Sequence, residues 1–487
     1  MSGWKNLLLR SSNRWRTKTS SRWKNLLVRT GNRWEKESSS RPLARLRLVV
    51  TMPPSRSWHG RDQAMAKGRV HALRSLGAEV FEFDTEPGFR SDRRTLRRQI
   101  ADVRLFRPDA VISAPHATFA TRIRWVEENS REKVVDQVAP NNVFIDLLQL
   151  PTILYWDHIL TQAMYSLPNP PSGFDNSRGG VIAELRRIFS HPRVYHFIPD
   201  SGHIAEVNRL GLGSFDANNH SVPGVPHKYV KYSERLRWRD GYDAKVAFFG
   251  NLWLTAAAHF RYPQAELMEI RQQALAACAS DWNLAPYQAY LNAINSLSST
   301  SRARLRLDVD QTYYWRFLDQ EITRVANGEL RLRKLAGCRR PVAYFGGFAD
   351  PESRQIAASA GFVFGKDLPA NESLAAAFRR TRISLDVVAA PFINGFSHKL
   401  LACFASGGFM LTTRKADISS CLGDDLADAI GFSSNDELAA KVEHYFSSDH
   451  ERVELVNQIG ALVRRDYSTR ALLARTVPLA LEHIRKR

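Results

Sequence analysis

The chain has 487 residues, of which 44% are hydrophobic and 24% charged, and its formal net charge is +20. This length is enough for two or three domains with their own cores, and the composition is that of a globular protein. The sequence contains no run of eighteen apolar residues, which excludes a hydrophobic transmembrane helix. The four cysteines show no paired spacing, which argues against a disulfide framework or a zinc site and favours a reducing compartment.

The basic charge is concentrated at the N-terminus, where residues 1–47 hold 13 Lys and Arg against 2 Asp and Glu. This stretch contains a repeat of period 19, in which the segment from Trp4 to Arg10 returns from Trp23 to Arg29. In each copy Trp and Leu fall on one helical face. We predict that residues 1–42 form a basic amphipathic extension that binds an anionic membrane surface through residues 1–40. A disordered basic tail and a transit peptide are the alternatives.

Strand and helix patterns alternate through residues 43–235, which predicts a first domain with a parallel, doubly wound sheet. Strands are expected at 46–51, 79–83, 110–113, 152–156 and 194–198, and helices at 62–76, 96–105, 143–148 and 204–210. Residues 221–226, which include two prolines and a glycine, are expected to form the linker to a second domain.

Polar side chains follow several strands of this first domain. They are His59, His116, the pair Asp157-His158, and the run Ser201-Gly202-His203. Ligands of open α/β sheets bind at the carboxyl ends of the strands, and a histidine or aspartate there could deprotonate an acceptor hydroxyl. For each residue a loop position or a helix cap is the alternative. Our candidates for the general base are Asp157 and His158, followed by His116.

A second α/β unit spans residues 240–487 and is interrupted by a helical insertion at about 263–335. Gly250-Asn251 and Gly346-Gly347 both follow predicted strands of this unit. Glycine at such a position lets a nucleotide approach the backbone, and a tight turn is the alternative. The pair Asp308 and Asp310 precedes a helical pattern, so we interpret it as an acidic helix start and not as a metal site.

The most informative segment runs from Arg382 to Thr413. It predicts a strand at 383–388, a turn at 391–397, a helix at 398–405 that ends at Gly407-Gly408, and a strand at 409–412. A strand, a glycine-containing loop and a helix N-terminus with a cation hold phosphate at the edge of parallel sheets. The candidate binding residues of this segment are Asn394, Gly395, Phe396, Ser397, His398 and Lys399.

This order of elements resembles the donor-binding segment of glycosyltransferases with the GT-B fold (glycosyl transferases group 1), and it is most similar to their spore-maturation-protein-like branch. Further matches are Thr412-Thr413 with Asp417, Asp436-Glu437-Leu438, and the stretch from Asp466 to Arg470. The resemblance covers about 245–481. It implies an α/β protein with two doubly wound Rossmann-like domains that face each other across a cleft.

The resemblance also implies a mechanism. The second domain would bind a nucleotide-diphosphate sugar, and the first would bind an unknown acceptor, which could be a glycan, a lipid-linked glycan or a protein. No metal or other cofactor is implied. His398 and Lys399 would stabilise the diphosphate, Asn394 would touch the sugar, and Gly250, Asn251 and Gly346 would lie along the nucleotide.

One departure from the family pattern leaves two functions open. Many GT-B enzymes carry two glutamates eight positions apart where this chain has Asn394 and Ala402. The first function is a metal-independent glycosyltransferase of the hexosyltransferase type. The second is a degenerate GT-B-like ligand-binding or scaffold protein. Nucleic-acid binding is supported by charge alone, without a base-stacking motif. We expect a cytoplasmic protein that the N-terminal extension can place at the inner membrane face.

Overall fold

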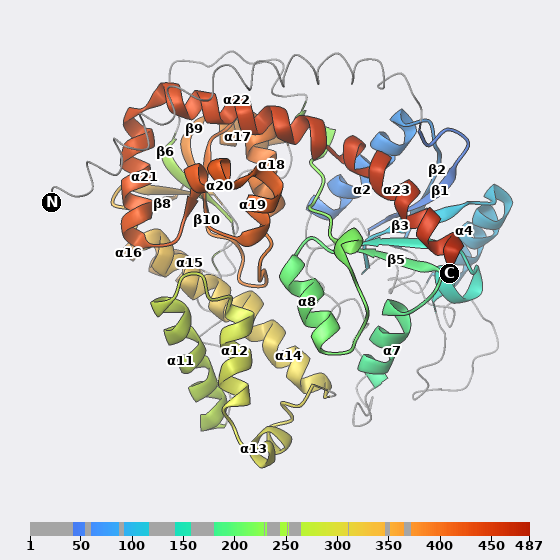
Figure 1. Ribbon diagram of the computed structural model, residues 1–487, viewed down its shortest axis with the longest axis horizontal. Coiled ribbons are helices and arrows are strands. Elements are labelled where there is room, and N and C mark those ends of the chain that lie inside the picture. The colour runs from blue at the N-terminus through green and yellow to red at the C-terminus, as the bar shows by residue number, and fades with distance from the viewer. Residues whose placement is uncertain are drawn as a thin grey trace.

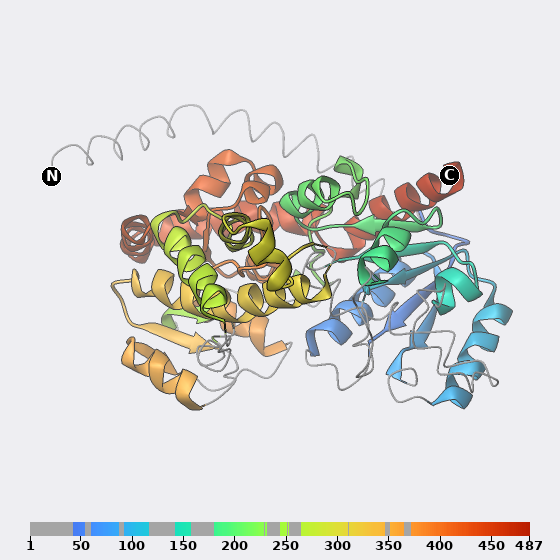
Figure 2. The ribbon, with the colours of Figure 1, turned by 90° about the horizontal axis from the view of Figure 1, so that it is seen from below.

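The computed structural model of the protein describes residues 42–53, 60–86, 92–115, 142–156, 180–227, 229–230, 244–250, 252, 264–309, 311–345, 351–364 and 372–487. The extension predicted for residues 1–40 lies outside these ranges. The two α/β domains lie side by side, with the first domain on the right and the second on the left (Figures 1 and 2). None of the described helices is both long and apolar enough to cross a bilayer.

The first domain is built on a parallel five-stranded sheet in the order β2-β1-β3-β4-β5. Its strands are β1 (Arg47–Met52), β2 (Glu79–Asp84), β3 (Ala110–Ser113), β4 (Thr152–Tyr155) and β5 (Val194–Phe197), and its helices include α2 (Gly60–Ser75), α4 (Arg93–Phe106), α7 (Gly180–Phe189) and α8 (Ser201–Arg209). A π-helical turn at Val143–Leu147 and a 3-10 turn at Ala217–Asn219 complete it. All five strands fall within two residues of the predicted ones. Helix α7 lies where the sequence analysis placed no helix.

Helix α4 shows how local sequence sets these elements. Its N-cap, Asp92, accepts a hydrogen bond from the amide of the third residue along. Leu96, Ile100 and Val103 recur at helical spacing and are buried against the sheet. The helix ends at Arg107, whose φ of 51° is in the left-handed region. The opposite face is rich in arginine and stays in solvent.

The second domain contains a parallel six-stranded sheet in the order β11-β10-β9-β6-β7-β8. Its strands are β6 (Ala244–Phe249), β7 (Val342–Phe345), β8 (Phe362–Phe364), β9 (Thr381–Asp386), β10 (Met410–Thr413) and β11 (Gly431–Phe432). Its helices are α16 (Pro351–Ser359), α17 (Glu372–Arg379), α18 (His398–Ala405), α19 (Ala416–Leu422), α20 (Asp424–Ile430), α21 (Asn435–Ser447) and α22 (Asp449–Asp466). Strands β6 and β9 are neighbours in space but not in sequence, so the strand order reverses between them.

A helical insertion follows β6 and consists of α11 (Ala265–Ser280), α12 (Pro286–Asn295), α13 (Ser299–Arg304), α14 (Thr312–Gln320), a π-helical turn (Glu321–Ala326) and α15 (Asn327–Ala336). Arg271 and Glu321 form a buried, two-pronged ion pair inside it, at 2.9 and 2.6 Å. The Tyr287 hydroxyl donates to Glu206 of α8 at 2.9 Å. The insertion therefore packs against the first domain, where its apolar residues share a core with α8. It also contacts the second domain, because Arg331 of α15 donates to the carbonyl of Val387.

The last helix, α23 (Thr469–Lys486), returns to the first domain (Figure 1). Leu472, Leu473 and Val477 lie in the core formed with α2 and the first sheet. The chain that leads into α23 passes beside the linker, where the amide of Val225 donates to the carbonyl of Tyr467 at 2.8 Å. The sequence analysis assigned all of 240–487 to the second domain. The structure places this final helix on the first because its apolar stripe is buried there.

The carboxyl-terminal edges of the two sheets meet. Asp200, which follows β5, contacts the loop that follows β9. The arrangement confirms the predicted fold class, which is a GT-B-type pair of doubly wound Rossmann-like domains with a helical insertion.

Candidate functional site

The candidate donor site begins where β9 ends at Asp386 and α18 begins at His398. Ser397 is the N-cap of α18, with extended backbone and a hydroxyl that accepts a hydrogen bond from the amide of Lys399 at 3.3 Å. Leu400, Leu401 and Phe404 anchor the helix in the core, so its N-terminus is fixed at the carboxyl edge of the sheet. This helix has the boundaries predicted from the sequence.

Lys399 joins the two strands between which the strand order reverses. Its ammonium donates to the carbonyl of Phe249, at the end of β6, at 2.6 Å. It also lies 2.9 Å from Oδ1 of Asp386, at the end of β9, as an ion pair without ideal hydrogen-bond alignment. The Asp386 side chain is fully buried, and that of Lys399 is 15% exposed. A reversal of strand order is where open α/β sheets bind their ligands.

Two further residues complete this switch-point cluster, which we define as Lys399, Asp386, Arg331 and Gly250. Arg331 of α15 donates to the carbonyl of Val387 at 3.1 Å. Burial lowers the pKa of Arg331, and the charge of Asp386 opposes that shift. A Cβ atom on Gly250 would lie 3.4 Å from the Lys399 ammonium and 2.8 Å from the ring of Phe248. Within this cluster two cations lie close to one carboxylate, an arrangement that is compatible with an anionic ligand.

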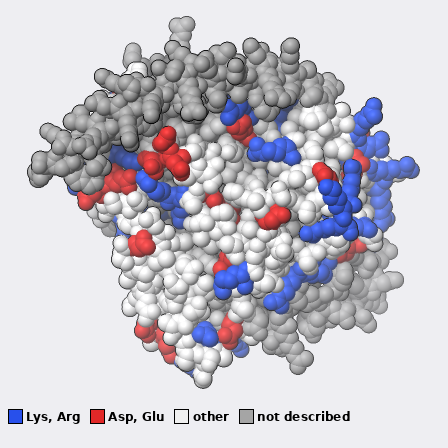
Figure 3. Space-filling view, in the orientation of Figure 1, with Lys and Arg blue, Asp and Glu red and all other residues white. Residues whose placement is uncertain are grey.

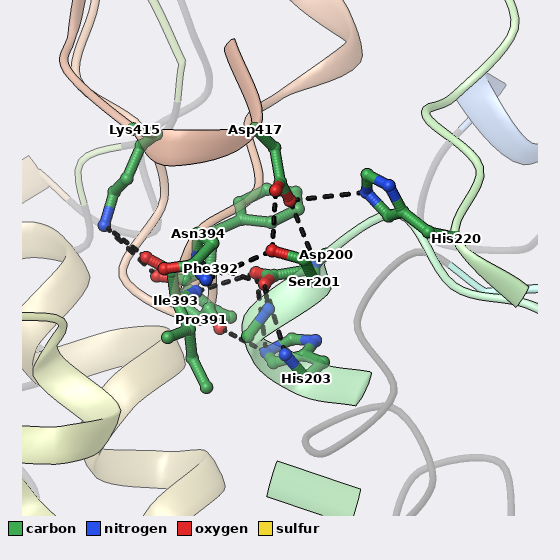
Figure 4. A network of polar contacts seen from close by, with 11 residues as sticks. Asp200, Ser201, His203, His220, Pro391, Phe392, Ile393, Asn394, Lys415 and Asp417 are labelled. Atoms are coloured by element: carbon green, nitrogen blue, oxygen red, sulfur yellow. Dashed lines mark hydrogen bonds and ion pairs between the residues drawn. The ribbon is translucent and has the colours of Figure 1, made fainter. Parts of the chain in front are cut away.

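A second cluster, the interdomain seam, joins the domains through Asp200, the buried N-cap of α8 (Figure 4). Its carboxylate accepts from its own helix, at the amides of Gly202 (2.8 Å) and His203 (3.2 Å). It also accepts from the other domain, at the amides of Ile393 (2.7 Å) and Asn394 (3.1 Å). One carboxylate thus satisfies backbone donors of both domains.

The environment of Asp200 favours its charged form. Burial by itself would raise the pKa of Asp200. The charge of His203 and the backbone hydrogen bonds from Asn394, Ile393 and Gly395 outweigh that effect and hold the pKa below its ordinary value. Asp200 therefore acts as a structural anion at neutral pH.

Asp417 makes the reciprocal contact from the second domain. Its carboxylate accepts from the amide of Ser201 at 2.9 Å and from the Ser201 hydroxyl at 2.6 Å. The side-chain amide of Asn394 donates to the same hydroxyl at 3.1 Å. The carbonyl of Asn394 accepts from the amide of Asp417 at 3.1 Å. Asn394 is therefore fixed at both its backbone and its side chain.

Two histidines, His203 and His220, contact residues of the second domain at the seam. The His203 ring lies 2.8 Å through Nε2 from the carbonyl of Pro391, which makes Nε2 the protonated nitrogen. His220 lies 3.4 Å from Asp417 through Nε2. The nearby Asp417 carboxylate raises the pKa of His220, against the opposing effect of burial. Figure 4 shows His220 approaching Asp417 from the side opposite Lys415.

The seam is closely packed. A Cβ atom on Gly202 would lie 2.4 Å from the side chain of Ile393, and one on Gly395 would lie 2.9 Å from Asp200. Larger residues at either position would push the domains apart. Lys415 donates to the carbonyl of Ile393 at 3.0 Å, and desolvation lowers its pKa.

The structure divides the predicted binding residues between these two clusters. Gly250, Ser397 and Lys399 lie at or beside the switch point, whereas Asn394 and Gly395 belong to the seam. Phe396 is 1% exposed and packs in the core. His398 is half-buried in the first turn of α18. The other candidates lie outside the described residues: His116, Asp157, His158, Asn251 and Gly346.

Several residues of the two clusters were not identified from the sequence. Asp386 had a signal, because it is a charged residue within an apolar strand. Asp200 had a weaker one, since Asp before a helix is a common N-cap. Arg331 and Lys415 had none, because their partners are distant in sequence. No group of three His, Cys, Asp or Glu side chains among the described residues is arranged to hold a metal.

One protein family matches the part of the second domain that contains the loop after β9 and the start of α18. Residues 335–477 match the family described as "Glycosyl transferase-like". The match confirms the resemblance to glycosyltransferases predicted for this segment. It does not distinguish the spore-maturation-protein-like branch. No match was found among curated proteins.

Solved structures were also compared with the whole chain. The Candida albicans trehalose-6-phosphate phosphatase N-terminal domain is 10% identical, with a TM-score of 0.42, over 90% of this chain and 97% of that one. An O-GlcNAc transferase mutant of Thermobaculum terrenum is 11% identical, with a TM-score of 0.46, over 91% and 68%. An alpha-glucosyltransferase in complex with UDP-glucose and DNA is 8% identical, with a TM-score of 0.46, over 89% and 99%.

Proposed function

We propose that the protein is a glycosyltransferase of the hexosyltransferase type, which moves a sugar from a nucleotide-diphosphate sugar to an acceptor. The observation that carries the proposal is the position of Lys399. It lies at the reversal of strand order, beside the N-terminus of α18, within the segment that matches the glycosyl transferase-like family. A diphosphate is the anionic part of such a donor.

The switch-point cluster would stabilise the leaving diphosphate. Charge develops on the phosphate oxygens as the bond to the sugar breaks. The α18 N-terminus contributes a partial positive charge, and Lys399 and Arg331 contribute two full charges against that of Asp386. In this proposal these groups would offset the charge of the leaving diphosphate in place of a metal ion. Arg331 is held by the insertion, which would give the insertion a role in shaping the donor site.

The acceptor would bind at the first sheet, where strand order reverses between β1 and β3. The hydroxyls of Thr51 and Ser113 meet there at 2.6 Å. His116, Asp157 and His158 follow β3 and β4 and remain our candidates for the base if the reaction inverts. The acceptor itself is proposed only as a hydroxyl-bearing glycan, lipid-linked glycan or protein.

A second candidate function is a degenerate GT-B-like binding or scaffold protein. Two observations favour it: the side-chain amide of Asn394 is already bonded to Ser201, and Ala402 is 1% exposed. Asn394 would have to leave Ser201 to reach a donor, and Ala402 has no polar side-chain group to offer in any conformation. Binding of a nucleotide sugar without turnover would support this candidate.

The N-terminal extension would place the protein at an anionic surface, which we propose is the inner face of the cytoplasmic membrane. Residues 1–40 carry the Trp, Leu and basic repeat. In Figure 3 many Lys and Arg side chains also gather over the first domain. The arginines exposed on and just after α4, Arg94, Arg98, Arg104 and Arg107, add positive charge to that domain. Charges of this kind are attracted to anionic lipid at low salt.

A donor screen tests the proposed function. Full-length protein would be titrated with a panel of nucleotide sugars and nucleoside diphosphates by calorimetry, and release of nucleoside diphosphate would then be measured with candidate acceptors. We expect one nucleotide family to bind and its sugar donor to turn over. Absence of binding by every nucleotide would reject the transferase, and binding without turnover under all acceptor conditions would favour the degenerate binding protein.

A further inference from the structure

A cavity of about 310 Å³ lies away from the switch-point cluster, between the two segments that cross from one domain to the other. The linker forms one wall through His220 and Ser221, and the returning chain forms another through Tyr467 and Arg475. Phe197 closes the cavity from the first domain, and Ser420 from the second. We call this the hinge cavity. Its walls come from both domains and both crossings.

The polar side of the hinge cavity suits an oxyanion. Arg475 is an exposed cation that forms no ion pair with the described acidic residues. The Ser221 hydroxyl is buried and lacks a hydrogen-bond partner among the described residues. A guanidinium and a hydroxyl are common donors to phosphate and carboxylate groups.

Asp417 also lines the cavity, but its carboxylate is already engaged by other groups of the protein. Its two oxygens accept from the amide and hydroxyl of Ser201, at the N-terminus of α8, and one of them faces His220. A helix N-terminus stabilises such an anion. Among the charged groups that line the cavity, Arg475 is therefore the one that no hydrogen bond or ion pair with a described residue already engages.

The apolar side of the cavity suits a ring or a short hydrocarbon. Phe197 and Leu479 contribute apolar surface. The Tyr467 hydroxyl donates to the carbonyl of Cys421 at 3.0 Å, which fixes the orientation of its ring. The volume is at the lower end of the range for small-molecule sites, about 300–1,000 Å³.

We propose that the hinge cavity binds a small organic oxyanion, which carries a phosphate or carboxylate on a ring or short apolar group, and that this ligand restrains the two domains. The oxyanion would pair with Arg475 and Ser221. The apolar part would pack on Phe197 and Tyr467 and reach Ser420 of the second domain, which also lines the cavity. Restraint follows from geometry, since a ligand in contact with all four walls bridges both crossings. The proposal does not depend on glycosyl transfer, because no wall residue belongs to the switch-point cluster.

Titration with phenyl phosphate, and with inorganic phosphate for comparison, tests the binding. We expect saturable binding of phenyl phosphate to the full-length protein, and weaker binding of phosphate, which lacks the ring. Arg475→Gln should weaken phenyl phosphate binding about 10-fold or more, as expected for a charged hydrogen bond. Arg470→Gln is the matched control, because Arg470 is an exposed arginine on the same helix and does not line the cavity. Ser420→Trp, at an exposed position on the rim, should block binding sterically.

Hydrogen exchange locates the ligand and separates this site from the donor site. Phenyl phosphate should slow exchange in residues 217–222 and 467–476 but not at the start of α18. Protection at α18 instead would overturn the proposal, because the ligand would then occupy the donor site. The absence of saturable binding, or equal weakening by Arg475→Gln and Arg470→Gln, would also overturn it. None of these outcomes bears on nucleotide-sugar turnover.

Discussion

Two clusters share one predicted donor segment but differ in how their charges are balanced. In the interdomain seam, the Asp200 carboxylate accepts from four backbone amides, and Asn394 is bonded at both backbone and side chain. In the switch-point cluster, two cations flank a single carboxylate. We interpret the seam as the contact that holds the domains together, and the switch point as the place where the proposed donor's diphosphate would bind.

The largest effect expected is on the rate of transfer, and it tests whether the chemistry lies outside both clusters. Replacing Asp157 with Asn, or His158 with Gln, should slow transfer about 10²–10⁴-fold if either residue is the general base. Donor affinity, measured by calorimetry on the same proteins, should persist. Equal loss of donor affinity, or an unchanged rate, would assign the pair to structure.

The next effect is on stability and tests the seam. Asp200→Ala removes the acceptor of four amides, two of which belong to the other domain. We expect a loss of about 3–5 kcal/mol in the free energy of unfolding, as for a buried charged partner. Asp92→Ala is the matched control: Asp92 is also an N-cap aspartate but lies at an exposed helix start, so its loss should destabilise the protein much less than that of Asp200. Similar losses in denaturant unfolding would show that the interdomain contacts contribute little.

The third effect is on affinity and tests the switch point. Lys399→Ala should weaken binding of the donor's nucleoside diphosphate about 10- to 150-fold, the value of a charged hydrogen bond of about 1.5–3 kcal/mol. The same change leaves Asp386 buried without this partner, so some stability will also be lost. Lys245→Ala, at the amino-terminal end of β6 and exposed, is the control that should change neither property.

A double variant separates the two consequences of losing Lys399. Adding Asp386→Asn to Lys399→Ala removes the carboxylate that lost its partner. Because Arg331 also faces Asp386, we expect only part of the stability to return, while affinity stays low. If affinity recovers together with stability, Lys399 acts only through folding.

The smallest effect is a pH dependence within the seam. Because Asp417 raises the pKa of His220 above 6.5, the folded state favours the protonated ring. This contribution, about 1 kcal/mol, is fully present below the unfolded pKa and is lost as the pH rises through the folded pKa. Denaturant unfolding should therefore show His220→Gln to be destabilising at pH 5.5 and nearly neutral at pH 9. A loss that does not change with pH would contradict the ion pair, and exposed His450 offers the control substitution.

Strongly patterned elements could be predicted from the sequence. The five strands of the first sheet and the helix His398–Ala405 stand out because their apolar residues form short runs or helical stripes next to glycine. The two-residue strand β11 carries too little pattern to be recognised. Helix α7 (Gly180–Phe189) was not predicted from the sequence.

The division of the donor segment could not be predicted. It depends on Asp200, which lies 193 and 194 positions from its partners Ile393 and Asn394. The residue types of Ile393 and Asn394 do not predict that their backbone amides donate hydrogen bonds to the other domain. The same holds for Arg331, whose position beside Asp386 is set by the packing of a whole insertion. The local sequence pattern predicts where the donor segment lies, but tertiary packing decides which of its residues belong to the switch-point cluster and which to the seam.

The most direct test of the account is a crystal structure of the protein with the nucleoside diphosphate that the donor screen identifies. The account predicts the β-phosphate beside the Lys399 ammonium and the N-terminus of α18, with the contacts between Asp200 and the amides of Ile393 and Asn394 intact. A diphosphate bound elsewhere, or one that displaces Asp200 from those amides, would contradict it.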